Sequence, residues 1–223
     1  MIADTHERLT GRPTVRQRQE LSERILIAAK QQFLMRGYND TTFALIASAG
    51  STSRGALYNR YVDKAALFGQ VVETEIHEMC ARAALVFDDQ VDVMESLVLQ
   101  AEQMITVATE PEHLALYRII TGDAPRTSVV DDALRAAWIL FASHMETYFE
   151  RQMANGRLKV RDRRNASEMF LGLVFQPVFV SIVYGMPQAS PEKIPDHIKR
   201  SVLLFLGGIG LVEMDGPRPI AES

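Results

Sequence analysis

Cysteine is almost absent from this 223-residue chain, since Cys80 is the only one. A single thiol cannot form an internal disulfide, which excludes a disulfide-stapled secreted domain and fits a reducing cytoplasm. The charged first residues are followed by no apolar core of a secretory signal. The longest apolar stretch, 169–184, is shorter than the ~20 residues that a membrane span requires. We therefore expect a cytoplasmic protein with no membrane partner.

Motifs of catalysis and metal binding are also missing. The sequence contains no GxSxG, no glycine-rich phosphate loop before a strand and no Cys/His nucleophile spacing. The five histidines are scattered, and no pair has ligand spacing with Cys80 or carboxylates, so we expect neither a metal nor a cofactor. We therefore expect a protein that is not an enzyme, and an all-helical enzyme is the least favoured alternative.

The chain has no overall excess of positive charge, since its formal net charge is −4. The charge is unevenly divided, however: residues 1–64 hold ten Lys or Arg against six acidic residues, whereas residues 65–223 hold fourteen against twenty-two. An acidic chain with a basic N-terminal part is suited to meeting a polyanion at that end only.

Alternating strand patterns are absent too, and helical periodicity is present instead. Residues 42–61 predict two short helices joined by a tight turn, with Thr42 and Ser53 as caps and with Leu57 and Tyr61 on one inward face. Gly55 and its neighbour Ala56 would let the backbone approach a DNA groove closely. The sequence thus predicts a helix-turn-helix, preceded by a helix over 21–38 that Gly37 ends.

Four linked motifs carry a resemblance to a known family. They are ILIAAKQQFLMRGY from Ile25, TFALIA from Thr42, SRGALYNRY from Ser53 and DKAALF from Asp63. Together they resemble the N-terminal domain of the tetracycline-repressor (TetR) family over the first third of the chain. The resemblance implies an all-α fold of about nine helices: a three-helix DNA-binding domain, 19–64, and a helical ligand-binding and dimerisation domain, 65–215, before a frayed end, 216–223.

The resemblance also implies roles in binding double-stranded DNA. Thr42 and Lys64 would contact phosphates, while Tyr58 and Tyr61 would brace the recognition helix with at least one hydroxyl on the backbone. The candidates for base edges are Ser53, Arg54, Gly55, Ala56 and Asn59. Physical chemistry allows Arg to bridge guanine and Asn to pair with adenine, although an Arg at a helix start contacts phosphate as often. For Arg60 we favour a solvated or phosphate-facing charge.

One position departs from the family pattern. Ser51 stands where the usual turn sequence has glycine, so either Ser51 adopts a positive φ or Gly50 turns one residue early. The N-terminal residues 1–18 form a second open question. They predict a basic flexible arm in which Arg12 enters the minor groove, or a solvated tail that adds only weak attraction.

Helices are expected throughout the rest of the chain. Caps, prolines and apolar periods predict them over 63–87, 92–108, 111–121, 134–152, 169–184 and 195–214. The stretch 169–184 has only two polar side chains, which predicts burial on all sides, partly against a second subunit. We therefore expect a homodimer, as the resemblance also implies. The predicted interface residues are Gly172, Phe175, Leu203, Leu206, Gly207 and Gly210.

The resemblance further implies a small-molecule pocket in the larger domain. Candidate lining residues are Met104, Tyr117, Trp138, Phe141, His144, Met145, Tyr148, Phe175, Gln176 and Phe179. A Met and aromatic stripe at helical spacing is otherwise ordinary core, but a polar group such as His144 or Gln176 on an apolar helix needs a partner. Pro177 should kink its helix or free a carbonyl, for a pocket wall or for the interface.

The resemblance implies a ligand-responsive transcriptional regulator, in which the ligand changes the spacing of the two DNA-binding domains and so lowers DNA affinity. We expect a repressor that binds a palindromic operator as a homodimer and is released by an apolar or aromatic effector. The sequence shows no acidic activation tail, which makes repression by occlusion the simpler expectation. The alternative is a dimeric ligand-binding module without specific DNA binding.

Overall fold

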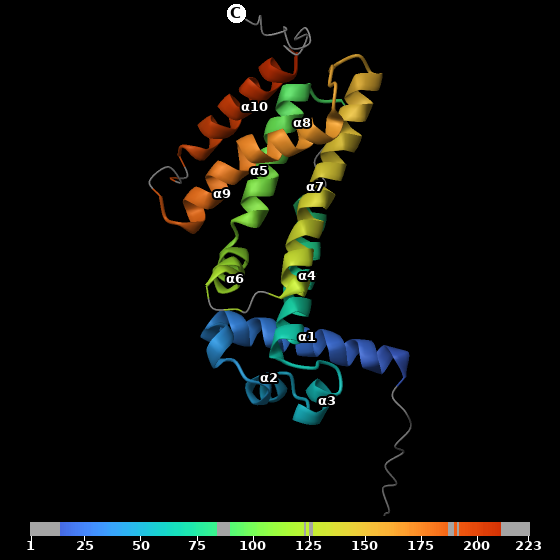
Figure 1. Ribbon diagram of the computed structural model, residues 1–223, viewed down its shortest axis with the longest axis vertical. Coiled ribbons are helices and arrows are strands. Elements are labelled where there is room, and N and C mark those ends of the chain that lie inside the picture. The colour runs from blue at the N-terminus through green and yellow to red at the C-terminus, as the bar shows by residue number, and fades with distance from the viewer. Residues whose placement is uncertain are drawn as a thin grey trace, which may run out of the picture. The chain divides into compact units, whose positions relative to one another are not determined.

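The computed structural model of the 223-residue chain describes residues 14–83, 90–122, 124, 127–186, 190 and 192–210. Within these residues the regular elements are all helices, as predicted. They are α1 (Val15–Asp40), α2 (Phe43–Ala49), α3 (Arg54–Tyr58), α4 (Lys64–Ala83), α5 (Val93–Ala108), α6 (Pro111–Thr121), α7 (Ser128–Ala154), α8 (Arg163–Phe170), the π-helix η1 (Leu171–Phe175), α9 (Gln176–Val183) and α10 (Ile194–Gly210) (Figure 1).

The chain divides into two compact units after Val71, within α4. We call the described residues up to Val71 the head and those from Val72 the body. The predicted boundary at Lys64 is seven residues earlier. The head extends further because Phe68, on α4, packs edge-on against Phe33 with ring centroids 4.9 Å apart and also meets Tyr38.

Helix α1 begins earlier than the sequence pattern indicates. Thr14 and Gln17 form a reciprocal capping box, in which each side chain accepts a hydrogen bond from the other's backbone N–H. Residues 15–18, which we had assigned to the flexible arm, are therefore helical. The first thirteen residues, including Arg12, lie outside the described residues. Gly37 has φ 77° and interrupts regular helical geometry as predicted, although α1 resumes to Asp40.

The body has a core shared by α5, α7, α8 and α10. Phe205 of α10 stacks on Phe149 of α7 at 5.7 Å between ring centroids and meets Phe170 of α8 edge-on at 5.3 Å. Leu97 of α5 and Val202 of α10 are fully buried in the same cluster. Helix α5 therefore packs on α10, while α8 packs on α7.

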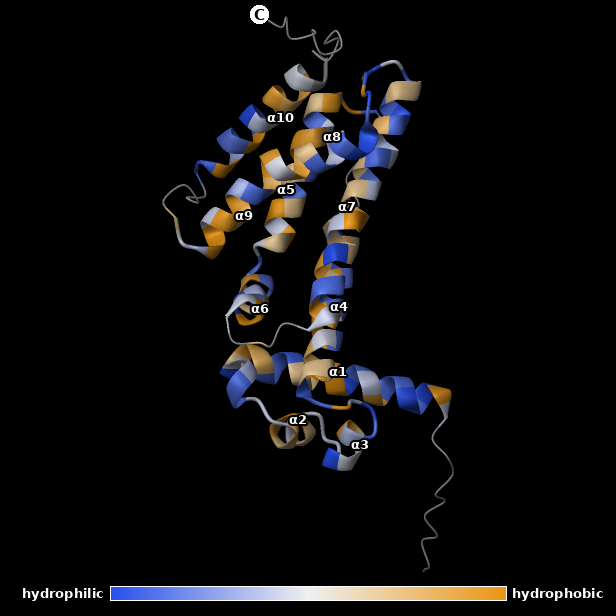
Figure 2. Cartoon of the chain, viewed as in Figure 1, coloured by the Kyte–Doolittle hydropathy of each residue, from blue (hydrophilic) through white to orange (hydrophobic). Residues whose placement is uncertain are grey.

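Helices α8, η1 and α9 continue one another, so the described residues form nine helices when this rod is counted once. The π-helical turn lies directly before Pro177, which has no N–H for a regular helical bond. The single chain buries only part of this stretch, since Met169 is 58% and Val180 41% exposed, and burial of the rest against a second subunit stays a prediction. Figure 2 shows hydrophobic residues concentrated along α9 and the last turns of α10.

The rod has the length and composition of a possible membrane span. Within Arg163–Val183 the most apolar 18-residue window has a mean hydropathy of 1.7, and a third of that window is buried. Core helices of soluble proteins meet the same criterion, so this finding is weak support for a membrane location. The predicted end of α4 near Phe87, the end of α10 near Met214 and the segment 216–223 lie outside the described residues.

Candidate functional sites

The turn between α2 and α3 is closed by Ser51. Its φ is 48°, in the left-handed region, whereas Gly50 has φ −83°. Gly50 is needed for another reason, because a Cβ at this position would lie 3.3 Å from the Cβ of Ala28 on α1. Of the two alternatives for this turn, the structure therefore shows the first, in which serine accepts the strained conformation.

The two short helices are capped as the sequence predicts. The Thr42 hydroxyl accepts a hydrogen bond from Leu45 N at 3.4 Å, and the Ser53 hydroxyl accepts one from Ala56 N at 3.1 Å. Both hydroxyls are thus occupied in holding the helix ends. A DNA contact through either hydroxyl would therefore use an oxygen that already accepts a hydrogen bond.

The outer side of α3 exposes most of the predicted base-edge residues. Leu57 is fully buried and anchors the helix, while Ala56 is half-buried. The exposed members are Ser53, Arg54, Gly55 and Asn59. A Cβ on Gly55 would meet only the Ser53 hydroxyl, 3.8 Å away, so this surface is open to close approach. The small residues leave Arg54 and Asn59 as the projecting polar groups.

Of the two tyrosines expected to brace α3, Tyr58 does so through its ring. Tyr58 is 63% exposed and its ring contacts Phe43 of α2, with centroids 4.9 Å apart. Tyr61 is half-buried, and burial raises the pKa of its phenol despite the opposing charge of Arg60. Neither hydroxyl has a hydrogen-bond partner among the described residues, contrary to the expected backbone contact. The bracing shown by the structure is the contact of the Tyr58 ring with Phe43.

Two basic residues predicted to face solvent or phosphate are engaged inside the head. The Arg60 guanidinium donates to Ser22 Oγ and to the carbonyl of Arg18 at 2.8 Å, which ties the end of α3 to the start of α1. The Lys64 ammonium donates to the carbonyls of Tyr38, Asn39 and Thr41 at 2.6, 3.1 and 2.9 Å.

Lys64 therefore has all three ammonium hydrogens occupied. Its Nζ also lies 4.3 Å from the centroid of the Tyr38 ring. Burial lowers the pKa of this ammonium, and the carboxylate of Asp40 partly opposes that shift. The carbonyls lie at the C-terminal end of α1, where a cation is favourable. In this arrangement a phosphate contact would require Lys64 to give up a hydrogen bond within the head.

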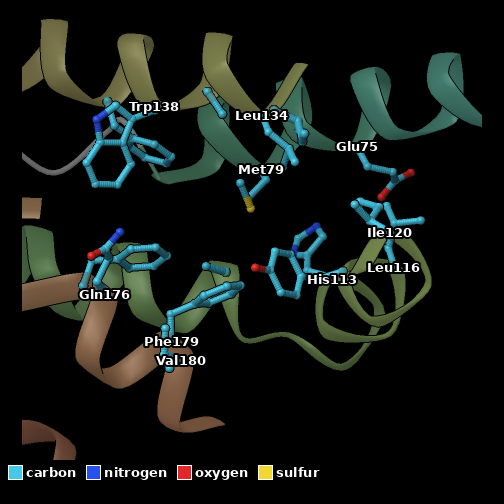
Figure 3. A pocket seen from close by; sticks show the side chains of 16 residues that line it. Glu75, Met79, His113, Leu116, Ile120, Leu134, Trp138, Gln176, Phe179 and Val180 are labelled. Atoms are coloured by element: carbon cyan, nitrogen blue, oxygen red, sulfur yellow. The ribbon is translucent and has the colours of Figure 1, made fainter. Parts of the chain in front are cut away.

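A cavity of about 340 Å³ lies in the body, within the usual range for small-molecule sites. Its described lining comes from α4, α5, α6, α7, η1 and α9 (Figure 3). Six of the ten predicted pocket residues line it: Tyr117, Trp138, Phe141, Phe175, Gln176 and Phe179. Residues that sequence reasoning missed include Glu75, Met79, His113, Leu116, Ile120, Leu134 and Val180.

The other four predicted pocket residues lie elsewhere in the body. Met104 packs against Ala142 and Leu171 in a separate small cluster, and Met145 and Tyr148 are buried in the main core. Nδ1 of His144 is buried without a hydrogen-bond partner among the described residues. The apolar period of α7 correctly predicted which side of the helix is buried. Some residues of that side pack in the core, however, and others line the cavity.

Aromatic rings dominate one part of the cavity lining. Phe175 and Phe179 stack with centroids 5.2 Å apart and planes 20° apart, and Tyr117 meets Phe179 edge-on at 4.9 Å. Figure 3 shows Trp138 and Gln176 at one end of the view and Glu75 at the other, with His113 between them. A flat, mainly apolar molecule fits such a surface.

Polar side chains are few in this cavity: Tyr117 and Gln176 were expected in the lining, whereas Glu75 and His113 were not. Glu75 of α4 is buried, and His113 of α6 lies with Nδ1 2.6 Å from the carbonyl of Val107. Both are polar residues on amphipathic helices, so the sequence pattern alone predicts that their side chains face solvent. The apolar residues Leu116 and Ile120 of α6, four apart, were the signal that α6 turns a face inward.

A second hollow of about 530 Å³ follows the outer side of α8, η1 and α10. Gly172, Met169, Leu173, Leu204 and Gly208 are among its lining residues. Among the predicted interface residues, Leu203 and Gly207 are also exposed on α10, and Cβ atoms on Gly172 and Gly207 would meet nothing within 4 Å. Leu206 packs on the core and Phe175 lines the cavity, whereas the surroundings of Gly210 lie outside the described residues.

A helix-turn-helix head followed by an all-helical, cavity-bearing body defines a class of DNA-binding regulators. The family of bacterial regulatory proteins called tetR matches residues 25–71, and the C-terminal domain of AefR-like transcriptional repressors matches residues 95–208. The chain therefore belongs to the TetR family of transcriptional regulators. Members of this family are regulators and not enzymes, which confirms that prediction.

Individual relatives agree with this assignment. The HTH-type transcriptional repressor BepR of Brucella suis biovar 1 (strain 1330) is 31% identical over 109 residues, 45% of this chain and 49% of BepR, so the match spans about half of that relative. A putative TetR-family regulator from Mesorhizobium loti MAFF303099 has a TM-score of 0.78 at 21% identity, covering 88% of this chain and 98% of its own. The flavonoid-responsive regulator FrrA has a TM-score of 0.70 at 24% identity, covering 85% and 97%.

A third solved structure contains a ligand. FadR from Bacillus subtilis in complex with stearoyl-CoA has a TM-score of 0.61 at 16% identity, covering 84% of this chain and 98% of its own. At these identities the three structures support the fold alone.

Proposed function

We propose that this protein is a cytoplasmic repressor that binds a palindromic operator as a homodimer and releases it when a small, mainly apolar aromatic molecule enters the body cavity. The observation that carries the DNA-binding half is the exposed side of α3, where small residues flank Arg54 and Asn59 above a buried Leu57. The matches to repressors by name favour repression over activation.

The geometry of B-DNA favours a dimer. One short helix reads only a few base pairs, so two heads related by a two-fold axis, one helical turn or more apart, gain affinity and length of site. The exposed apolar side of α8, η1 and α10 supports pairing through this surface, because apolar surface left in water by a single chain is stabilised by burial against a second copy.

Ligand control is supported by the continuity of α4. This helix carries Lys64 and Phe68 in the head and reaches Glu75, Ile76 and Met79 of the cavity lining. A ligand can act only through a difference in its affinity for the DNA-competent and released states. Because α4 belongs both to the head and to the cavity wall, a ligand in the cavity can favour one position of this helix, and so one of the two states, over the other.

Binding to the DNA flanking its own gene tests the proposal. We expect a specific gel shift that weakens as salt rises, and a protected site with two-fold symmetry in a footprint. Arg54→Ala should weaken specific binding by about tenfold or more, because a base or phosphate contact is removed. Arg135→Ala, an exposed arginine of the body, is the matched control and should bind as the parent does.

The outcome separates the two candidate functions. Preference for one fragment over random duplex, lost in Arg54→Ala and kept in Arg135→Ala, supports the repressor. A folded dimer that prefers no fragment, even at low salt, would instead indicate a ligand-binding module without specific DNA binding.

A further inference from the structure

The polar side chains of the body cavity differ in how far the protein already uses them. Five of the described lining residues carry a polar group: Glu75, His113, Tyr117, Trp138 and Gln176. His113 lies with Nδ1 2.6 Å from the carbonyl oxygen of Val107 and 3.6 Å from the carboxylate of Glu110. Glu75 likewise has an interaction of its own. These two groups are therefore engaged before a ligand enters.

The other three polar side chains have no hydrogen-bond partner among the described residues. The Tyr117 hydroxyl, the Trp138 indole and the Gln176 amide all carry donor hydrogens, and the indole N–H can only donate. The rest of the lining is mainly apolar. Covering such a donor with apolar atoms leaves its hydrogen unpaired, which costs free energy. These donors therefore favour a ligand that brings an acceptor to them.

Two of the three donors lie at the same end of the cavity. Figure 3 shows Trp138 of α7 and Gln176 of α9 on opposite sides of the space, with the Gln176 amide directed toward Trp138 and with Glu75 at the far end. Phe179 follows Gln176 on α9 and stacks on Phe175. Trp138 is half-buried and Gln176 is exposed, so the Gln176 side chain has room to turn its amide nitrogen onto a ligand.

We propose that this end of the cavity binds a hydrogen-bond acceptor, such as a carbonyl oxygen, on an aromatic ligand. The oxygen accepts from Nε1 of Trp138 and from the Gln176 amide, while the aromatic part of the ligand packs on Phe175 and Phe179. A carbonyl oxygen has two lone pairs and so accepts two hydrogen bonds. This inference rests on the proposed effector role of the cavity, and it adds the chemistry by which ligands of similar shape are distinguished.

Benzophenone and diphenylmethane serve as probes, because they differ only in a carbonyl group in place of a methylene group. Equilibrium dialysis against the full-length protein without DNA gives both affinities, and their ratio cancels effects of size and shape. Trp138→Phe and Gln176→Leu should each lower the ratio of ketone to hydrocarbon affinity by about three- to tenfold, the effect of one hydrogen bond. Gln31→Leu, which removes an exposed amide of α1, is the matched control and should keep the parent ratio.

Benzophenone also reports where its carbonyl lies, which keeps the inference testable if a variant fails to fold. Under long-wave ultraviolet light the excited ketone oxygen takes a hydrogen from a neighbouring C–H group, and the ketone carbon then bonds to the carbon left behind. Mass spectrometry of peptides from the irradiated parent protein locates the modified residues. We expect them on α7 near Trp138 or on η1 and α9 near Gln176.

Several results would overturn the inference. They are failure of benzophenone to bind up to its solubility limit, a ratio that neither Trp138→Phe nor Gln176→Leu lowers, an equal fall of the ratio in Gln31→Leu, and crosslinks confined to α4 or α6. Failure of the effector role has a different signature, because benzophenone then binds and crosslinks as expected but leaves operator affinity unchanged. Operator release by diphenylmethane, with a ratio that both cavity variants leave unchanged, would keep the effector role and reject the acceptor site.

Discussion

Ser51 is the one non-glycine residue with positive φ among those described. The left-handed conformation costs an L-amino acid roughly 1–2 kcal/mol, and glycine avoids this cost but has more freedom to lose on folding. Ser51→Gly should therefore raise the free energy of unfolding of the head by about 0.5–1 kcal/mol, measured as a higher denaturant midpoint. Ser51→Ala keeps the strained backbone, so an equal gain in that control would contradict the explanation.

Lys64 joins the start of α4 to the end of α1 through three backbone carbonyls. Hydrogen bonds from a charged donor contribute about 1.5–3 kcal/mol, and the lower part of that range applies to a partly exposed ammonium. Lys64→Met should lower the denaturant midpoint of the head accordingly, whereas Lys159→Met, at an exposed position of the body, should not. An unchanged midpoint for Lys64→Met, with DNA affinity lost, would assign Lys64 to phosphate contact alone.

Cys80 is buried in α4, and burial raises the pKa of its thiol from 9.0 to about 11. Between these values the unfolded chain loses the proton and the folded chain keeps it, so the thiol's contribution to stability falls as pH rises through this window. Because the thiolate is the reactive form, a maleimide should label native protein slowly up to about pH 9 and unfolded protein rapidly. Equal labelling rates in the two states would show that the thiol is accessible, and Cys80→Ser gives the background.

At the scale of elements, the exposed apolar surface of α10 is the feature that the single chain leaves unexplained. Leu204 is 67% exposed in the hollow beside α8 and η1. If this surface pairs two copies, Leu204→Glu places two like charges close to the two-fold axis and should shift the protein from dimer to monomer in light scattering, with its helical content kept. Leu99→Glu changes an exposed leucine of α5 and should leave the dimer intact.

Local chemistry explains which elements the sequence could predict. Helix α6 was expected at its observed bounds because Pro111 begins it and Gly122 follows it, and α5 was expected from Asp92, which is its N-cap in the structure. The start of α7 was missed although Thr127 caps it, because only Val130 and Ala133 are buried before Leu134 and the other residues of these first turns are exposed. Caps act within four residues and so are visible in a sequence.

Tertiary packing decided what the sequence could not predict. The π turn at Leu171–Phe175 has different surroundings on its two sides: Gly172 lines the outer hollow and Phe175 lines the cavity. The sequence of the turn does not contain this information. His113 and Glu75 looked like surface polar groups until their helices were placed around a common space. The aromatic part of the cavity was predictable from periodicity, and these two polar groups were not.

At the scale of the molecule, the charge division predicted from the sequence matters for the proposed function. The basic N-terminal part is attracted to phosphate, while the acidic remainder opposes non-specific binding to the same duplex. Within the head, however, Arg60 and Lys64 are engaged in contacts between helices. Fewer basic groups are therefore available for phosphate than a count of the sequence indicates, and DNA affinity should depend more on Arg54 and on pairing of two heads.

The proposed control of DNA by ligand requires a reciprocal effect that can be measured. If a ligand lowers operator affinity by some factor, thermodynamic linkage requires saturating operator to lower ligand affinity by the same factor, commonly about 5–150-fold. Titration of a small aromatic compound that binds the cavity, followed with and without saturating operator through the fluorescence of Trp138, the single tryptophan of the sequence, gives one factor. Operator binding with and without that compound gives the other. A random duplex at equal concentration should leave ligand affinity unchanged. Loss of operator binding with no change in ligand affinity would mean that the compound acts outside the cavity, for example on the DNA itself, and would reject coupling between the cavity and the heads.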